Sequence, residues 1–293
     1  MLETRGLTRT FGETVAVADV DLRVPAGTLT GFVGGNGAGK TTTMRMIMGI
    51  LAPTSGEVLW QGHPATRADR ASFGYMPEER GLYPKQPLLR QLVYLGRLHG
   101  MSASAATRAA TEHLGRFGLA DRAGDKLESL SLGNQQRVQI TAAVMTNPTA
   151  LVLDEPFSGL DPEAVDSMAD LLHEHASRGV PVIFSSHQLE LVERLCHSLL
   201  ILSRGRVVAS GTTAQLRGRG RVRHRLVAGG DVGWVRGVEG VSVLDVDGST
   251  AVLELLADDA ADRLLREALA RGSVRELSPL VPSLSDIYRE VTA

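Results

Sequence analysis

Residues 34–42 read Gly34-Gly35-Asn36-Gly37-Ala38-Gly39-Lys40-Thr41-Thr42, and they constrain the architecture around them more than any other part of the chain. They satisfy the pattern G-x-x-x-x-G-K-[ST], in which a glycine-rich backbone turns its N–H groups around phosphate oxygens. The apolar run 28–33 predicts a buried strand before this stretch, and 41–50 predicts a helix after it. We therefore predict a phosphate-binding loop. Lys40 would reach the β- and γ-phosphates of a nucleoside triphosphate, and Thr41 would place its hydroxyl on Mg²⁺.

A pair of carboxylates follows the apolar run Ala150-Leu151-Val152-Leu153, which predicts a short buried strand. Ligands of open α/β sheets bind at the carboxyl ends of the strands, so Asp154 and Glu155 would lie where a nucleotide binds. We predict that Asp154 holds Mg²⁺, directly or through water. Glu155 is then the candidate general base toward the attacking water.

Length and composition bound the remaining possibilities. A chain of 293 residues is longer than a single hydrophobic core usually supports, so two domains are expected. The formal charge of −2 gives no electrostatic case for nucleic acid, so no such partner is expected. A single cysteine, Cys196, cannot form an internal disulfide and fits a reducing compartment. The longest apolar runs, such as 198–202, are far shorter than the ~20 residues that span a bilayer.

The order of patterns predicts an α/β nucleotide-binding domain over residues 1–215. Alternating polarity at 15–24 is typical of a half-exposed antiparallel strand. Helical periodicity predicts a helical subdomain at about 87–147. Strand, helix and strand patterns then follow one another between 151 and 184, and this alternation predicts a parallel sheet.

The motifs of residues 1–215 resemble, in their order, those of the ATP-binding subunits of ABC transporters. After the phosphate-binding loop comes Leu130-Ser131-Leu132-Gly133-Asn134-Gln135-Gln136-Arg137, which resembles the family's LSGGQ signature. Asp161 then stands at the position of the D-loop, and His187 at that of the H-loop. Phe11 lies where the family stacks an aromatic ring on adenine, and Glu78 lies where the Q-loop belongs.

The resemblance implies an α/β P-loop NTPase of the ABC ATPase type, with an antiparallel β subdomain and a helical subdomain. It implies that two nucleotide-binding subunits, in a homo- or heterodimer, enclose ATP and Mg²⁺ between them. The signature residues Ser131, Leu132, Gly133 and Asn134 of one subunit would contact the γ-phosphate bound by the other. His187 would contact the same phosphate and keep the attacking water in line with Glu155.

The same resemblance implies a membrane partner. ATP hydrolysis would energise a separately encoded integral membrane permease, more in the manner of an exporter, with the chain held on the cytoplasmic face of the cell membrane through that permease. The segment 78–84 and the helical subdomain are the expected contact surface.

Two positions of the site depart from the family pattern. Glu78 replaces the glutamine of the Q-loop, and its carboxylate adds a charge beside the triphosphate while still offering an oxygen to Mg²⁺. In the signature, Leu132 replaces the first glycine and Asn134 the glutamine. We expect hydrolysis to be intact; a weakly active site is the competing interpretation.

Residues 216–293 predict a small α+β accessory domain. A short helix is expected at 232–238 and a hairpin around Asp247-Gly248-Ser249. With a helix at 258–271 and a strand at 274–281, the order β-α-β-β-α-β is ferredoxin-like. A terminal helix follows at 284–291. The domain resembles the small C-terminal domain of sodium- and drug-efflux subunits, which implies a regulatory or dimer-supporting role.

Arginines alternate with other residues between 217 and 225. Such a row of cations is able to contact anionic lipid or nucleic acid, but it more often marks a solvated edge strand.

Two other classes of protein carry the same nucleotide motifs. One is a soluble, non-transport ABC ATPase that acts on ribosomes or DNA; the other is a regulatory nucleotide-binding module that does not hydrolyse. The first class usually has two nucleotide domains or a long coiled-coil insertion, whereas this sequence has one phosphate-binding loop and no sustained heptads.

Overall fold

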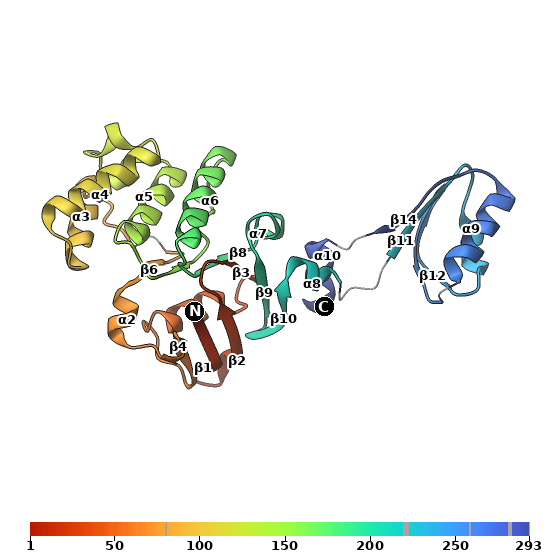
Figure 1. The fold of residues 1–293 in the computed structure, drawn as a ribbon, viewed down its shortest axis with the longest axis horizontal. Helices are drawn as coiled ribbons and strands as arrows, with labels where there is room; N and C mark the ends of the chain where they lie inside the picture. The colour runs from red at the N-terminus through yellow and green to blue at the C-terminus, as the bar shows by residue number, and fades with distance from the viewer. Residues whose placement is uncertain (80, 219–222, 258, 281–282, 293) are drawn as a thin grey trace. The chain divides into compact units, whose positions relative to one another are not determined.

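The computed structural model describes residues 1–79, 81–218, 223–257, 259–280 and 283–292. The chain forms two compact units, Met1–Thr212 and Thr213–Ala293 (Figure 1). No helix in the described ranges combines the length and the apolar character that a membrane crossing requires.

The central sheet of the first unit has the strand order β10-β9-β3-β8-β7-β6. Its strands are β3 (Leu29–Val33), β6 (Phe73–Met76), β7 (Ala150–Leu153), β8 (Val182–Ser186), β9 (Ser198–Ser203) and β10 (Arg206–Thr212). All neighbours are parallel except β9 and β10. The central strands β3, β7 and β8 are buried along their whole length, as their unbroken apolar runs predict. The expected parallel sheet is confirmed.

A second, antiparallel sheet has the order β2-β1-β4-β5. Its strands are β1 (Leu2–Phe11), β2 (Thr14–Val24), β4 (Ser55–Trp60) and β5 (His63–Pro64). In β2, Val20, Leu22 and Val24 are buried and the residues between them are exposed, which matches the alternation in the sequence. Apolar side chains of both sheets and of helix α1 (Lys40–Ile47) share one core, in which the rings of Trp60 and Phe73 meet edge to face at 4.9 Å.

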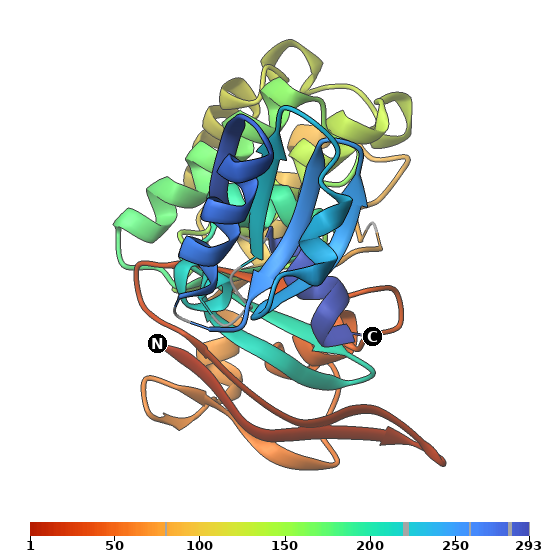
Figure 2. The same ribbon diagram turned by 90° about the vertical axis from the view of Figure 1, so that its right-hand side faces the viewer.

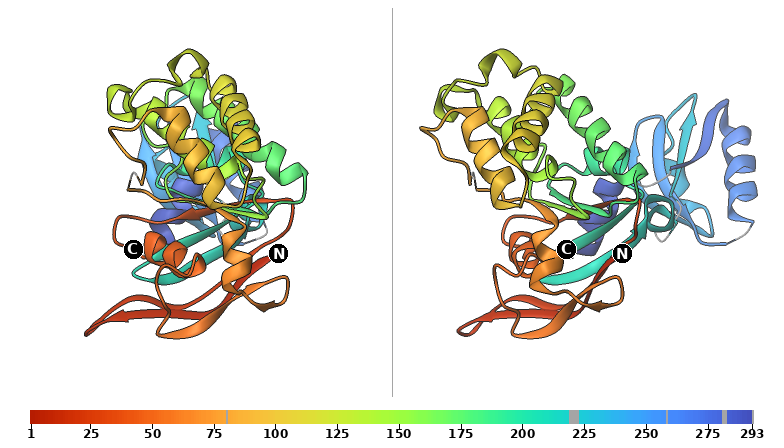
Figure 3. Two further views of the ribbon diagram at one scale, coloured as in Figure 1. Left: turned by 90° about the vertical axis from the view of Figure 1, so that its left-hand side faces the viewer. Right: turned by 60° about the vertical axis from the view of Figure 1, so that its left-hand side comes forward.

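Helices cover the opposite side of the central sheet. In both panels of Figure 3, α3, α4 and α5 gather on one side of this sheet, and the antiparallel sheet lies on the other. Their bounds are α3 (Leu88–Leu98), α4 (Ala103–Arg116) and α5 (Leu132–Val144). Ser102 caps α4 by accepting a hydrogen bond from the backbone N–H of Ala105 at 3.2 Å. Further α-helices of the unit are α2 (Arg67–Ala71), α6 (Pro162–Ser177) and α7 (Leu189–Leu195), and two 3₁₀ turns lie at Ala120–Arg122 and Leu127–Ser129.

The core histidine His175 of α6 makes stability depend on pH. Burial, together with the charges of Arg178 and His113, lowers the pKa of His175 to about 4. A histidine in an unfolded chain has a pKa of ~6.5. Between this pH and pH 4, the unfolded chain therefore binds more protons than the folded chain does. The stability that neutral His175 contributes is therefore complete above about pH 6.5 and is lost across this acidic window.

We expect the free energy of unfolding of the unmodified protein to fall by roughly 1–2 kcal/mol more than that of His175→Leu between pH 7 and pH 5. Urea unfolding at both pH values measures this difference. His173→Leu is the matched control, because His173 is exposed on the same helix. An equal pH dependence in His175→Leu and the unmodified protein would contradict the prediction.

The second unit is a small α+β domain with the antiparallel strand order β12-β13-β11-β14. Its strands are β11 (Arg223–Ala228), β12 (Val241–Asp247), β13 (Thr250–Leu255) and β14 (Val274–Leu280). Together with the 3₁₀ turn η3 (Gly233–Gly237) and helix α9 (Ala260–Arg271), these strands make the expected ferredoxin-like arrangement. Figure 2 shows α9 lying over one face of the sheet, where Leu264 and Ala268 enter the core.

A helix pair completes this unit. Helix α8 (Thr213–Arg217) packs against α10 (Leu284–Thr292), and Leu216, Leu284 and Ile287 are buried. The hairpin is present as expected, since Asp247 pairs with Thr250. Residues 258, 281 and 282, which the sequence assigned to the ends of elements, lie outside the described residues.

The arginine row is not an edge strand. Its strand, β11, lies between β13 and β14, so its backbone is paired on both sides. Arg217 belongs instead to α8, and Arg219 and Arg221 lie outside the described residues. The expectation of a solvated edge was wrong, because alternating polarity is the same in an edge strand and in a central strand whose second face is open.

Candidate functional site

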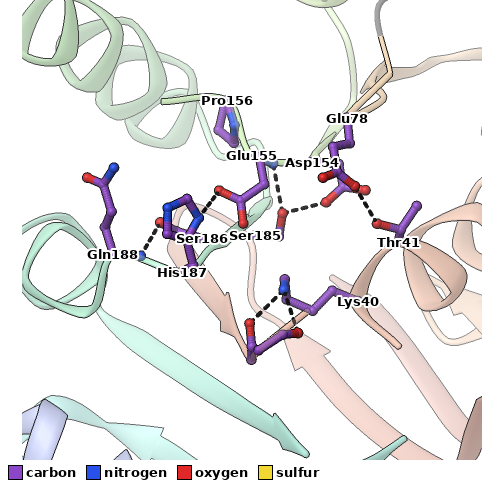
Figure 4. Close-up of polar contacts among 12 residues, drawn as sticks. Lys40, Thr41, Glu78, Asp154, Glu155, Pro156, Ser185, Ser186, His187 and Gln188 are labelled. Atoms are coloured by element: carbon purple, nitrogen blue, oxygen red, sulfur yellow. Dashed lines mark hydrogen bonds and ion pairs between the residues drawn. The ribbon is translucent and has the colours of Figure 1, made fainter. Parts of the chain in front are cut away.

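The glycine-rich loop joins β3 to α1 and closes around its own lysine. Lys40 begins α1, and its Nζ donates hydrogen bonds to the carbonyl oxygens of Gly34 at 2.6 Å and Gly35 at 3.2 Å (Figure 4). Gly39 caps the helix with a φ of 104°, and a Cβ there would lie 2.7 Å from the carbonyl oxygen of Ala16. Only glycine fits this position, so the loop keeps its tight path before the helix. The expected helix ends at Ile47 rather than Ile50, because Gly49 turns left-handed.

A pocket of about 240 Å³ lies against this loop. It brings together residues that are far apart in the sequence: Ala16, Gly35, Asn36, Gly37, Ala38, Gly39, Lys40, Thr41, Thr42, Glu78, Asp154 and Glu155. The cation of Lys40, backbone donors and three carboxylates thus share one polar cavity. This arrangement suits a triphosphate that is bound together with a divalent cation.

Asp154 has one oxygen held and one free. Its Oδ1 accepts a hydrogen bond from Ser185 Oγ at 2.5 Å, whereas its buried Oδ2 has no hydrogen-bond partner among the described residues. Close by, Thr41 Oγ1 donates to Glu78 Oε2 at 3.3 Å (Figure 4). Hydroxyl and carboxylate oxygens are the ligands that Mg²⁺ prefers, so the residues present fit this ion. Thr41 and Asp154, with Glu78 beside them, would hold it.

Glu155 faces the same cavity and is paired with the H-loop histidine. Its Oε2 lies 3.0 Å from Nδ1 of His187 (Figure 4). The carboxylate side chain is 14% exposed and the imidazole 58%, so the histidine stands at the open side of the site. Ser185 and Gln136 form hydrogen bonds with the backbone of Glu155, and sequence reasoning gave neither residue a role of its own. A signal for Ser185 was present, since it is a polar residue in an otherwise apolar buried strand.

The signature residues lie outside the pocket of their own copy. Ser131 caps α5, where its Oγ accepts from the N–H of Asn134 at 3.4 Å, and Leu132 is 58% exposed. A Cβ on Gly133 would lie 3.0 Å from the carbonyl oxygen of Gly159, so the signature runs beside the D-loop. None of these residues lines the pocket described above.

Asp161 has a structural part in the D-loop. It caps α6 by accepting from the N–H of Ala164 at 2.8 Å, and its other oxygen accepts from Arg137 at 3.3 Å. Because Arg137 belongs to α5, this ion pair joins the helix of the signature to the segment that follows Glu155.

Phe11 lies at the end of β1 and is 47% exposed. The guanidinium of Arg9 stacks over its ring at 4.5 Å from the centroid, and Arg9 Nη1 donates to the carbonyl oxygen of Ala52 at 2.8 Å. Phe11 does not line the pocket at the phosphate-binding loop.

A glycine-rich loop between a strand and a helix, with two carboxylates at the end of a nearby parallel strand, defines a P-loop nucleoside triphosphatase. The comparisons with known proteins narrow this class. Residues 17–158 match the ABC transporter family, and residues 211–292 match the C-terminal domain of DrrA1-3-like ATP-binding proteins.

Relatives match over most of the chain. It is 38% identical over 291 residues to YhaQ of Bacillus subtilis, described as an uncharacterized ABC transporter ATP-binding protein, and this covers 99% of the chain and 98% of the relative. It is 34% identical over 223 residues to the daunorubicin/doxorubicin resistance ATP-binding protein DrrA of Streptomyces peucetius, covering 74% of the chain and 66% of DrrA. A solved ATP-binding subunit of an ABC transporter is 32% identical, with a TM-score of 0.69 over 75% of this chain and 92% of that one.

The chain therefore belongs to the family of ABC transporter ATP-binding proteins. Members of this family bind and hydrolyse ATP, form dimers and work with membrane permease subunits. The sequence-based assignment to this family and to its efflux branch with a small C-terminal domain is confirmed.

Proposed function

We propose that this protein hydrolyses Mg²⁺-bound ATP in a dimer and thereby drives export through a separately encoded permease. In this proposal, residues 1–215 form the nucleotide-binding domain, with the helical subdomain at 87–147, and residues 216–293 form an accessory domain. The protein would act on the cytoplasmic face of the cell membrane, held there by the permease. The observation that carries the proposal is the pocket that combines Lys40 with the carboxylates of Asp154 and Glu155.

Each group in the pocket has a distinct task in this proposal. Lys40 and the loop N–H groups would neutralise the β- and γ-phosphates. Mg²⁺, held by Thr41 and Asp154 with Glu78 beside them, would supply positive charge to the phosphate oxygens. Glu155 would take a proton from the attacking water. His187 is hydrogen-bonded to Glu155, and it would contact the γ-phosphate and keep the attacking water in line with that carboxylate.

The second subunit would complete the site. The exposed Leu132 and the capping Ser131 lie at the N-terminus of α5, a helix of 13 residues, and outside their own pocket. A helix N-terminus offers unpaired N–H groups and a favourable dipole to an anion. A two-fold dimer would bring this end of α5 to the γ-phosphate bound by the other copy.

The helical subdomain offers a surface for the permease. A groove of about 560 Å³ is lined by α3 residues and their neighbours: Pro87, Leu89, Arg90, Val93, Tyr94, Arg97, Thr107, Ala123 and Gly124. Tyr94 is 51% exposed there, and Tyr83 of the segment 78–84 is 54% exposed. Exposed tyrosines beside arginines are typical of protein interfaces. Export as the direction is supported by the drug-resistance relative and by the matched C-terminal domain.

The experiment first asks whether a neighbouring reading frame encodes a multi-span membrane protein. That candidate permease is then combined with the full-length protein in lipid vesicles. We expect Mg²⁺-dependent ATP hydrolysis that rises several-fold when this partner is present. Lys40→Ala should weaken ATP binding by about 10- to 100-fold and abolish the stimulation, because the cation at the phosphates is lost. Arg206→Ala is the control, since that cation is exposed on β10 and lies outside both the pocket and the groove of the helical subdomain. Full stimulation of Lys40→Ala would contradict the proposal.

A further inference from the structure

The two carboxylates at the end of β7 need a backbone turn to face one pocket. Consecutive side chains of an extended strand point to opposite sides, so Asp154 and Glu155 would diverge if β7 continued through them. Instead, Glu155 has a φ of +50°, in the left-handed region that residues other than glycine seldom adopt. Both side chains consequently line the pocket. Such a conformation is unfavourable by itself and persists only where the surroundings hold it.

Ser185 of β8 holds this turn from the side of the sheet. Its Oγ accepts a hydrogen bond from the backbone N–H of Glu155 at 2.7 Å and donates one to Asp154 Oδ1 at 2.5 Å (Figure 4). The directions are fixed, because an ionised carboxylate only accepts and an amide N–H only donates. The side chain of Ser185 is fully buried, so no water competes for either bond.

Gln136 of α5 holds the same turn from the other side. Its Nε2 donates to the carbonyl oxygens of Glu155 at 2.9 Å and Pro156 at 3.0 Å. The unusual backbone of Glu155 is thus fixed at its N–H by Ser185 and at its C=O by Gln136. Of these two, only Ser185 also contacts the carboxylate of Asp154.

We propose that Ser185 is a positioning residue for both carboxylates of the hydrolytic site. By occupying Asp154 Oδ1, it leaves Oδ2 as the free oxygen for Mg²⁺. By accepting from the N–H of Glu155, it keeps the left-handed turn that directs the second carboxylate into the pocket. This inference rests on the proposed roles of Asp154 and Glu155, and it adds a single hydroxyl that acts on both.

The test compares Ser185→Ala with Ser185→Thr in the full-length protein. Removing the hydroxyl should lower kcat for ATP hydrolysis by about 10- to 100-fold and weaken metal binding by about 10-fold, the usual range for partners of metal ligands. Metal affinity is measured by electron paramagnetic resonance of Mn²⁺ with a non-hydrolysable ATP analogue. Binding of ATP without metal should stay unchanged, because the phosphate-binding loop is intact. Threonine restores the hydroxyl, and its activity should return to within about threefold of the unmodified protein.

Ser198→Ala is the matched control. Ser198 begins β9 of the same sheet, where its Oγ lies 3.3 Å from Thr30 Oγ1, at the end of the strands opposite to the site. Ser198→Ala also removes a hydroxyl from the same sheet, but it should keep metal binding and kcat. If Ser185→Ala does not fold, Ser185→Cys, which keeps only a weak donor and acceptor, provides the comparison with threonine.

Two results would overturn the inference: metal affinity and kcat unchanged in Ser185→Ala, or losses that threonine does not restore. Glu155→Gln separates this failure from that of the proposed function. If Glu155→Gln abolishes hydrolysis while Ser185→Ala leaves it unchanged, only the role of Ser185 is refuted. If Glu155→Gln hydrolyses ATP normally, the assignment of the general base itself is refuted.

Discussion

Glu155→Gln is expected to lower kcat for ATP hydrolysis by about 10²- to 10⁴-fold, the contribution of a positioned general base. The amide of glutamine is close in shape to the carboxylate and can keep a hydrogen bond to His187, but it cannot accept the proton of water. ATP binding should be nearly unchanged, since Lys40 and the loop N–H groups are untouched. Release of inorganic phosphate measures turnover, and equilibrium titration with labelled ATP measures binding.

This substitution should also change the oligomeric state. Hydrolysis is the step that would separate the two copies, so Glu155→Gln with ATP should accumulate as a dimer in light scattering. Glu163→Gln, an exposed position in the first turn of α6, is the control and should behave as the unmodified protein. Normal turnover in Glu155→Gln would remove Glu155 from the mechanism.

The parts of the site that the sequence predicted are those in which function depends on local geometry. The phosphate-binding loop needs glycines, a lysine and a helix start at fixed spacing, so a short stretch specifies it. Asp154 and Glu155 directly follow a strand that a short apolar run also predicts, so their position could be read from neighbouring residues. The partnership between Asp154 and Ser185 is different, because these residues are 31 positions apart and meet only when β7 pairs with β8. A hydroxyl in a buried strand indicates that a partner exists, but not which one.

The small domain shows the same limit. Its elements and hairpin were predicted correctly, because turn residues and periodicity are local signals. The position of β11 at the centre of the sheet was not, since strand order depends on which backbones pair across the domain. Arg223 and Arg225 alternate with His224 and Leu226 just as they would at an edge. The pairing of β11 with both β13 and β14 depends on the tertiary structure of the domain, and the sequence pattern of one strand does not predict it.

Mixing two inactive variants is expected to restore hydrolysis, because each site would combine the loop of one copy with the signature of the other. Lys40→Ala removes the cation of the loop. Ser131→Asp keeps the cap of α5, since aspartate caps as well as serine does, but it places a negative charge against the γ-phosphate. Each variant alone should lose at least about 100-fold in turnover, because both sites of its dimer carry the defect.

In an equal mixture, half of the dimers contain one copy of each variant. One site of such a dimer carries both defects, and the other carries neither. Turnover should therefore recover to roughly one quarter of that of the unmodified protein when each site works independently. A mixture no more active than its components would show that Ser131 serves the nucleotide of its own chain. That result would conflict with the position of Ser131 outside its own pocket, at the exposed start of α5. Recovery would assign the capping serine to the partner's γ-phosphate, because no other arrangement repairs a lost lysine and a repelling aspartate at once.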